Sequence, residues 1–126
     1  MDIKPILIVD DAAIVRESIA DWLNAAGYKT EMAETGEEAL ALIAKKDFSI
    51  VILDVRLPGK SGITVLKEIK AAKPKIKSII ITAFPSEGAA DEVKKLGAVD
   101  YLIKPIFPEN LEKIILETLD KYEHEK

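Results

Sequence analysis

Short runs of apolar residues recur along the chain, and each run ends at a polar or charged residue. They cover residues 6–9, 50–53, 79–81 and 101–103. The runs are rich in β-branched residues and too short for helices, which is typical of strands buried on both faces of a parallel sheet. The pattern therefore predicts four strands of one such sheet.

Segments with apolar residues at helical spacing separate these runs. The first is expected to end at Gly27, and the second to begin at Thr35, which forms a capping-box pattern with Glu38. The apolar face of the first helix consists of Val15, Ile19, Trp22, Leu23 and Ala26, and that of the second of Leu40, Ile43 and Ala44.

Three further helices follow the later strands. The third, with Ile63, Leu66 and Ile69 on one face, should end before Pro74. The fourth should end at Gly97, after Ala89, Val93 and Leu96. The fifth should carry Pro108 in its first turn and bury Leu111, Ile114, Ile115 and Thr118.

Residues 28–33 are expected to form a fifth, more polar strand. Lys29 and Glu31 alternate with Tyr28, Thr30 and Met32, which is typical of an edge strand with one face in water. The sum is a (βα)₅ pattern. Because crossovers between parallel strands are right-handed, it predicts an α/β, doubly wound, five-stranded parallel sheet with helices on both faces. Residues 1–126 are expected to form one domain.

Composition narrows the possible functions. The net charge of −4 argues against a dedicated nucleic-acid binder, and Lys73, Lys75 and Lys77 are interpreted as a solvated loop entering a strand. The chain shows neither a run long enough to span a bilayer nor a signal-peptide pattern, and it contains no cysteine. A cytoplasmic protein without thiol chemistry is expected.

The polar residues that end the strands are the candidate chemistry. Asp10 and Asp11 end the first strand, Asp54 the third, Thr82 the fourth and Lys104 the fifth. In an open α/β sheet the ligand site lies beyond the carboxyl ends of the strands, so these side chains should converge. Crowded carboxylates without His or Cys favour a hard cation, Mg²⁺ or alternatively Mn²⁺. Removing one charge, by Asp10→Asn or Asp54→Asn, should stabilise the metal-free protein.

Four motifs resemble those of the receiver domains of bacterial and archaeal response regulators. They are Ile6-Leu-Ile-Val-Asp-Asp11, Asp54-Val-Arg-Leu-Pro58 followed by Gly62, Ile81-Thr-Ala83, and Gly97-Ala-Val-Asp-Tyr-Leu-Ile-Lys-Pro105. The resemblance covers essentially the whole chain, and the four motifs occur in order. It implies a flavodoxin-like fold, similar to chemotaxis regulators, with strand order 2-1-3-4-5.

The resemblance also implies a role for each site residue. Asp54 would be the phosphoacceptor, and Thr82, the Ala83 backbone and Lys104 would bind the phosphoryl group. Asp11 and Asp54 would bind Mg²⁺ directly, Asp10 through water, and Arg56 through its backbone carbonyl. Thr82 and Tyr101 would form the switch, and the Lys104–Pro105 bond would be cis.

The implied function is a two-component phosphorelay switch. A sensor histidine kinase or phosphotransfer protein would phosphorylate the chain, which would catalyse only its own phosphotransfer and dephosphorylation and would not otherwise be an enzyme. A downstream protein or second subunit would dock on the face of the fourth helix, fifth strand and fifth helix, without direct nucleic-acid or membrane binding. Arg56 and Phe84 lie at positions that vary in the family and are expected to tune phosphoryl lifetime.

Three alternatives stay open. The first is an aspartyl-phosphate hydrolase of the haloacid dehalogenase type, although Asp10-Asp11-Ala12-Ala13 lacks the Asp-x-Asp of those enzymes. The second is a degenerate receiver used only as a scaffold. The third is the N-terminal piece of a larger DNA-binding transcription factor. Two aromatic residues receive plain interpretations: Trp22 as core packing and His124 as part of a polar tail.

Overall fold

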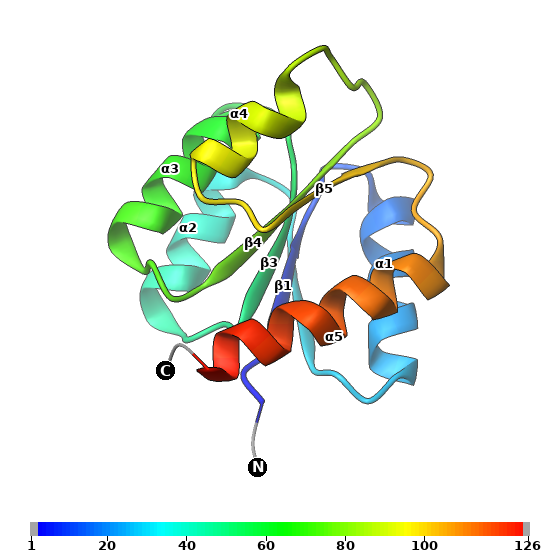
Figure 1. Ribbon diagram of the computed structural model, residues 1–126. Helices are drawn as coiled ribbons and strands as arrows, with labels where there is room; N and C mark the ends of the chain where they lie inside the picture. The colour runs from blue at the N-terminus through cyan, green and yellow to red at the C-terminus, as the bar shows by residue number, and fades with distance from the viewer. Residues whose placement is uncertain (1–2, 125–126) are drawn as a thin grey trace.

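The computed structural model describes residues 3–124 as an alternation of strands and helices (Figure 1). Its strands are β1 (Ile6–Val9), β2 (Thr30–Ala33), β3 (Ile50–Asp54), β4 (Lys77–Thr82) and β5 (Asp100–Ile103). Its helices are α1 (Ala13–Ala25), α2 (Gly36–Lys45), α3 (Gly62–Ala72), α4 (Ala89–Lys95) and α5 (Pro108–His124). Within these residues the predicted (βα)₅ order is confirmed, with β2 beginning at Thr30 rather than Tyr28.

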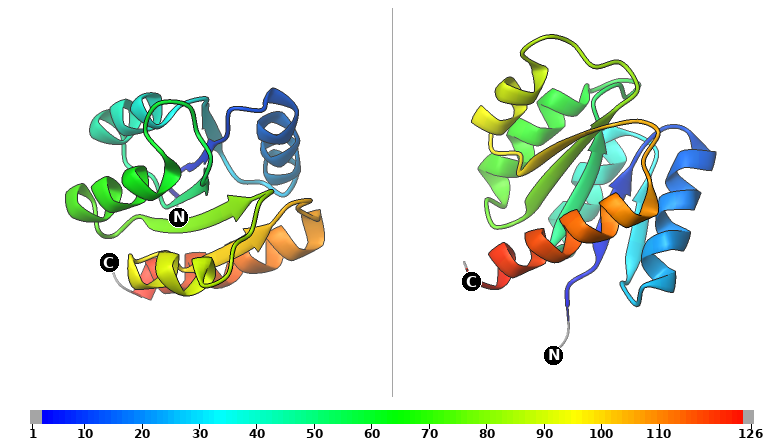
Figure 2. Two further views of the ribbon diagram at one scale, coloured as in Figure 1. Left: turned by 90° about the horizontal axis from the view of Figure 1, so that it is seen from above. Right: turned by 45° about the vertical axis from the view of Figure 1, so that its right-hand side comes forward.

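All neighbouring strands pair in parallel, in the order β2-β1-β3-β4-β5. The predicted flavodoxin-like topology and the edge position of β2 are therefore confirmed. Helices α1 and α5 cover one face of the sheet, and α2, α3 and α4 cover the other (Figures 1 and 2).

Alternate side chains of each central strand pack into two separate hydrophobic cores, one on each face of the sheet. Leu7 and Val9 of β1 pack toward α2, α3 and α4, whereas Ile6 and Ile8 pack toward α1 and α5. The same alternation runs through β3 and β4 because successive side chains of a strand point to opposite faces. This is why the central strands are continuous apolar runs.

The prediction that β5 is buried on both faces was wrong. Residues 100–102 are half-buried, and the Ile103 side chain is 56% exposed. With strand order 2-1-3-4-5, β5 is the second edge of the sheet, and its apolar residues extend to the surface. The apolar content of residues 101–103 was therefore not enough to distinguish an edge strand from a central strand.

Three smaller predictions were also wrong. Ala26, predicted on the apolar face of the first helix, is exposed and directly follows the last residue of α1. Ala44 is exposed on α2, and Gly36 and Ala39 join Ile43 on the buried face instead. Lys77 is not in the solvated loop but is a buried residue of β4, which is longer than its apolar run.

The helix ends follow the expected chemistry. Thr35 caps α2, its side chain accepting the Glu38 N–H over 3.1 Å, while the Glu38 carboxylate accepts from the backbone of Glu34 rather than of Thr35. Gly27 and Gly97, after α1 and α4, have φ of 98° and 107°, which favours glycine. None of the helices formed by residues 3–124 is long and apolar enough to cross a membrane.

Candidate functional site at the carboxyl ends of the strands

Three carboxylates meet where β1 and β3 end. The sheet register pairs Val9 with Leu53, so the residues that follow, Asp10 and Asp54, lie side by side. Asp11 completes the group, and one oxygen from each of the three carboxylates lies within 4.8 Å of the others. Asp10 is fully buried and Asp54 is 5% exposed, whereas Asp11 is open to solvent. Figure 2 (left) shows the strands and the loops around them from above.

The Lys104 ammonium joins two of these carboxylates. Its Nζ donates to Asp10 Oδ2 over 2.7 Å and to Asp54 Oδ2 over 3.2 Å. Burial alone would lower the pKa of Lys104, but the hydrogen bond to Asp10 and the charges of Asp54 and Asp10 raise the pKa above its ordinary value of 10.5. Lys104 is therefore charged at neutral pH and compensates part of the negative charge.

Asp54 holds its negative charge less readily than a free aspartate. Burial raises the pKa of Asp54 above its ordinary value of 3.8. The negative charge of Asp10 raises this pKa further. The 3.1 Å hydrogen bond from the Arg56 N–H to Asp54 Oδ1 and the nearby Lys104 ammonium both act to lower it. The carboxylate is held in place but incompletely compensated.

The Asp10 carboxylate makes shorter hydrogen bonds than the Asp54 carboxylate. Its Oδ1 accepts the Ala12 N–H over 2.9 Å while Oδ2 accepts from Lys104. Its own backbone N–H donates to the Ala33 carbonyl at the end of β2. Contacts to three different segments therefore fix the orientation of Asp10.

Thr82 is the buried last residue of β4. Its hydroxyl oxygen accepts the Phe84 N–H over 3.0 Å, and Ala83 lies between these two residues in the loop. Beneath the loop is a cavity of about 200 Å³ that reaches the half-buried Tyr101 of β5. Thr82 and Tyr101, predicted as switch partners, therefore line the same cavity, together with Val55, Ile63, Phe84 and Val93.

Two loops meet above the carboxylates. The Arg56 guanidinium lies over the Phe84 ring, 4.5 Å from its centroid, a cation–π contact. Arg56 and Phe84 each donate a backbone N–H to the functional side chain two positions earlier, Asp54 and Thr82. The stacked pair thus connects the β3–α3 loop to the β4–α4 loop.

Comparison with known proteins shows which family the chain belongs to. Residues 6–116 match the description "Response regulator receiver domain". The chain belongs to the response regulator receiver domain family. Its site residues therefore lie in a fold whose relatives are two-component regulators.

Named relatives agree with this assignment. The receiver domain is 38% identical over 102 residues to sporulation initiation phosphotransferase F of Bacillus subtilis, covering 81% of this chain and 82% of that protein. It is 43% identical to the transcriptional regulatory protein ZraR of Salmonella typhimurium over 90% of this chain, which is 26% of that protein. This chain therefore spans about a quarter of the length of ZraR.

A solved structure gives the same result for the fold. The receiver domain superimposes with a TM-score of 0.94 on a CheY-like response regulator receiver domain protein from Methanospirillum hungatei. The two are 34% identical, and the match covers 99% of this chain and 100% of that one. Family membership goes against the alternative of a haloacid dehalogenase-type hydrolase.

The residues of this receiver domain fit a divalent cation. Asp10, Asp11 and Asp54 offer oxygen ligands only, which suits Mg²⁺ or Mn²⁺. Asp11 is solvent-exposed, so the pocket can be reached from water. The Lys104–Pro105 peptide bond, beside the pocket, is cis, the isomer that the resemblance implies.

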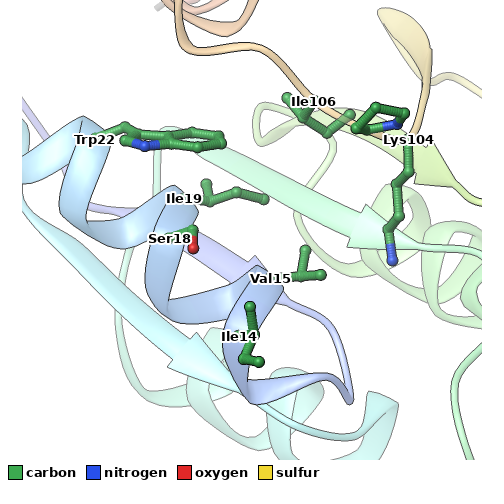
Figure 3. A pocket seen from close by; sticks show the side chains of 8 residues that line it. Ile14, Val15, Ser18, Ile19, Trp22, Lys104 and Ile106 are labelled. Atoms are coloured by element: carbon green, nitrogen blue, oxygen red, sulfur yellow. The ribbon is translucent and has the colours of Figure 1, made fainter.

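An apolar groove of about 180 Å³ lies beside Lys104, between α1 and the β5–α5 loop (Figure 3). Trp22 is half-buried against the core, as interpreted, but it also lines this groove. The groove is otherwise lined by Ile14, Val15, Ser18, Ile19, Lys104, Pro105 and Ile106. His124 is the last residue of α5, and its side chain lies outside the described part of the chain.

The sequence reasoning missed Arg16. This arginine is 9% exposed and donates from Nη1 to the Asp10 backbone carbonyl over 2.8 Å. The signal was available, because Arg16 stands three positions before Ile19 and seven before Leu23, on the apolar face of the first helix. A charged residue on such a face calls for a buried partner.

Proposed function

We propose that this receiver domain accepts a phosphoryl group on Asp54 in a Mg²⁺-dependent reaction. The observation that carries the proposal is the meeting of the Asp10, Asp11 and Asp54 oxygens within 4.8 Å, with Lys104 Nζ 3.2 Å from Asp54. Mn²⁺ can take the place of Mg²⁺ because it shares the preference for oxygen ligands.

Charge explains the proposed division of roles. An Asp54 oxygen attacks phosphorus while the bond from phosphorus to the donor's leaving group breaks, and the leaving group takes the electron pair. Two anions meet in this step, so positioning and positive charge must supply the catalysis. Lys104 contributes one positive charge. Asp11, Asp54, the Arg56 carbonyl and, through water, Asp10 would hold Mg²⁺, which would supply the remaining positive charge.

Thr82 and Tyr101 would report the modification. The Thr82 hydroxyl accepts from Phe84 and retains its own proton to donate to a phosphoryl oxygen, as the Ala83 N–H can. Movement of Thr82 would open the shared cavity to the Tyr101 ring. Phosphorylation would then bias a two-state equilibrium through contacts that only one state makes.

The partners follow from the family. A histidine kinase or a phosphotransfer protein is proposed as donor, and a downstream protein or second subunit as the partner on the α4–β5–α5 face. We propose that residues 1–126 form one receiver domain that acts in the cytoplasm. A DNA-binding output domain, as in a longer transcription factor, is a second possibility, favoured by the match to a transcriptional regulator of which this chain spans a quarter.

The test is phosphorylation by acetyl phosphate, which transfers its phosphoryl group and leaves acetate. Intact mass is measured with Mg²⁺ and with chelator, on the wild type and on Asp54→Asn; Asp47→Asn, an exposed aspartate outside the site, is the matched control. We expect one phosphoryl group on the wild type and on Asp47→Asn, only with Mg²⁺. Labelling of Asp54→Asn at the wild-type rate would refute the assignment, and an unlabelled wild type would support a scaffold receiver.

A further inference from the structure

Arg16 is a buried cation on α1 that directly holds the loop carrying two of the three carboxylates. It is 9% exposed, and its Nη1 donates to the main-chain carbonyl of Asp10 over 2.8 Å. Its Nη2 lies 3.6 Å from Glu34 Oε1, in the loop after β2. One side chain thus connects α1 to the ends of two neighbouring strands.

The start of α1 offers no side-chain cap of its own to hold the β1–α1 loop. Ala12 occupies the N-cap position of α1 and provides no side-chain hydrogen bond. The Ala12 N–H is used by the Asp10 side chain itself. Ala12 and Ala13 carry only methyl groups, so the guanidinium supplies a side-chain anchor that this helix start lacks.

The anchor acts on the backbone and leaves the carboxylate oxygens free for other partners. Asp10 uses its two side-chain oxygens for Ala12 and Lys104, while Arg16 takes the carbonyl. The Asp10 N–H is bound to Ala33, next to Glu34. Arg16 and the end of β2 therefore hold the backbone of Asp10. Asp11 is the next residue in the chain, so its position depends on the same backbone.

We infer that Arg16 is a positioning residue for the carboxylate pocket: through the Asp10 carbonyl it fixes the β1–α1 loop so that Asp10 and Asp11 meet Asp54. The inference rests on the proposed binding of Mg²⁺ by these carboxylates. Arg16 does not touch the cation or the phosphoryl group. Its removal should weaken cation binding by loosening the loop, beyond any loss of stability.

The experiment compares Arg16→Met, which keeps an apolar stem without donors, with Arg16→Lys, which keeps one cationic donor group. The matched control is Ser49→Ala at the opposite end of the strands. It removes a hydrogen bond of the same length, 2.8 Å from the buried Ser49 Oγ to the Lys4 carbonyl, and a longer one of 3.3 Å to the Pro5 carbonyl. Mg²⁺ binding is measured by titration calorimetry, and amide hydrogen exchange at Ala12 is measured in chelator.

Arg16→Met should weaken Mg²⁺ binding about tenfold, as loss of supporting contacts does at metal sites, and Arg16→Lys about threefold. In acetyl phosphate labelling, the Mg²⁺ concentration for half-maximal rate should rise more than the maximal rate falls. Ala12 exchange should be at least about tenfold faster in Arg16→Met. Ser49→Ala should leave all these quantities at wild-type values.

Mg²⁺ binding by Arg16→Met within twofold of wild type, or an equal loss in Ser49→Ala, would overturn the inference. If Arg16→Met does not fold, Arg16→Lys decides, and wild-type Mg²⁺ affinity in that variant would overturn it. If the wild type binds no Mg²⁺, the proposed function fails. Ala12 exchange then decides on Arg16 separately, since unchanged exchange in Arg16→Met would exclude the anchor.

Discussion

The two ends of the strands are built on different principles. At the amino ends, buried Ser49 donates to the Lys4 carbonyl, and backbone groups of Pro5, Ser49 and Lys77 bond to one another, all of them neutral. At the carboxyl ends, two buried carboxylates share one lysine. These hydrogen bonds at the amino ends are made between neutral groups, whereas the carboxyl ends hold an excess of negative charge that a cation and a phosphodonor can use.

The comparison teaches where function costs stability in this protein. Neutral hydrogen bonds give stability that is independent of pH and of metal ions. Crowded carboxylates give a structure whose stability depends on protonation, on Lys104 and on added cation. Substitutions at the two ends should therefore respond differently to pH and to Mg²⁺.

The largest effect is expected for Lys104→Met. Without the ammonium, Asp10 and Asp54 lose their shared cation in a largely buried site, and unfolding free energy in chelator should fall by about 3 kcal/mol. Urea denaturation at neutral pH measures it. Lys60→Met, which breaks the partly exposed pair with Glu68, is the control and should change stability by less than about 1 kcal/mol. Equal losses of unfolding free energy in the two variants would mean that the buried Lys104 contacts stabilise the protein no more than the partly exposed Lys60–Glu68 pair does.

Asp54→Asn should raise the stability of the metal-free protein by about 1.5 kcal/mol at neutral pH. Because the folded-state pKa of Asp54 is raised, the folded protein favours the protonated form. Ionised Asp54 therefore lowers the stability of the wild-type protein. This loss of stability is absent at a pH below the ordinary pKa of 3.8, grows as the pH rises, and is complete above the raised pKa. Urea midpoints across this range, with chelator and with Mg²⁺, measure it.

Added Mg²⁺ should narrow or reverse that gap, since it stabilises only the form that binds it. A less stable Asp54→Asn protein in chelator would show that Asp54 is a structural acceptor, and the interpretation of a repulsive pocket would be wrong.

Ser49→Ala should lower stability by about 1 kcal/mol through the loss of the neutral hydrogen bonds that the buried Ser49 hydroxyl makes to the Lys4 and Pro5 carbonyls. The loss should be the same across the pH range used for Asp54→Asn and with or without Mg²⁺, because no charge is involved. The same urea series measures it. A loss that varied with Mg²⁺ would break the proposed separation between the two ends of the strands.

The smallest effect is expected for Asp10→Asn, a gain of about 0.5 kcal/mol in chelator. The sequence does not distinguish Asp10 from Asp54, but Asp10 accepts from Ala12 and Lys104 at shorter distances than Asp54 accepts from Arg56 and Lys104. An asparagine at either position must turn its NH₂ toward one donor. Because the hydrogen bonds of Asp10 are shorter than the 3.1 and 3.2 Å bonds of Asp54, this cost offsets more of the relief from repulsion at Asp10. A gain at least as large as that of Asp54→Asn would show that these hydrogen bonds contribute little.

Much of the fold and of the candidate site could be predicted from local patterns of apolar and polar residues. Continuous apolar runs ended by Asp10, Asp54, Thr82 and Lys104 were enough to predict a parallel sheet with a polar cluster at one edge, because strand periodicity and right-handed crossovers leave few arrangements. The family motifs, which lie in those same strand ends, added the strand order. These features depend on residues close together in the chain.

Tertiary structure alone decided the rest. The exposure of Ile103 depends on β5 having a neighbour on one side only, and the burial of Lys77 on its place in β4. The difference between Asp10 and Asp54 depends on where the Lys104 Nζ lies and on which backbone donors reach each oxygen. Arg16 acts between α1, β1 and β2, segments that only folding brings together. Burial and hydrogen-bond partners belong to the packed molecule, so a single stretch of sequence cannot specify them.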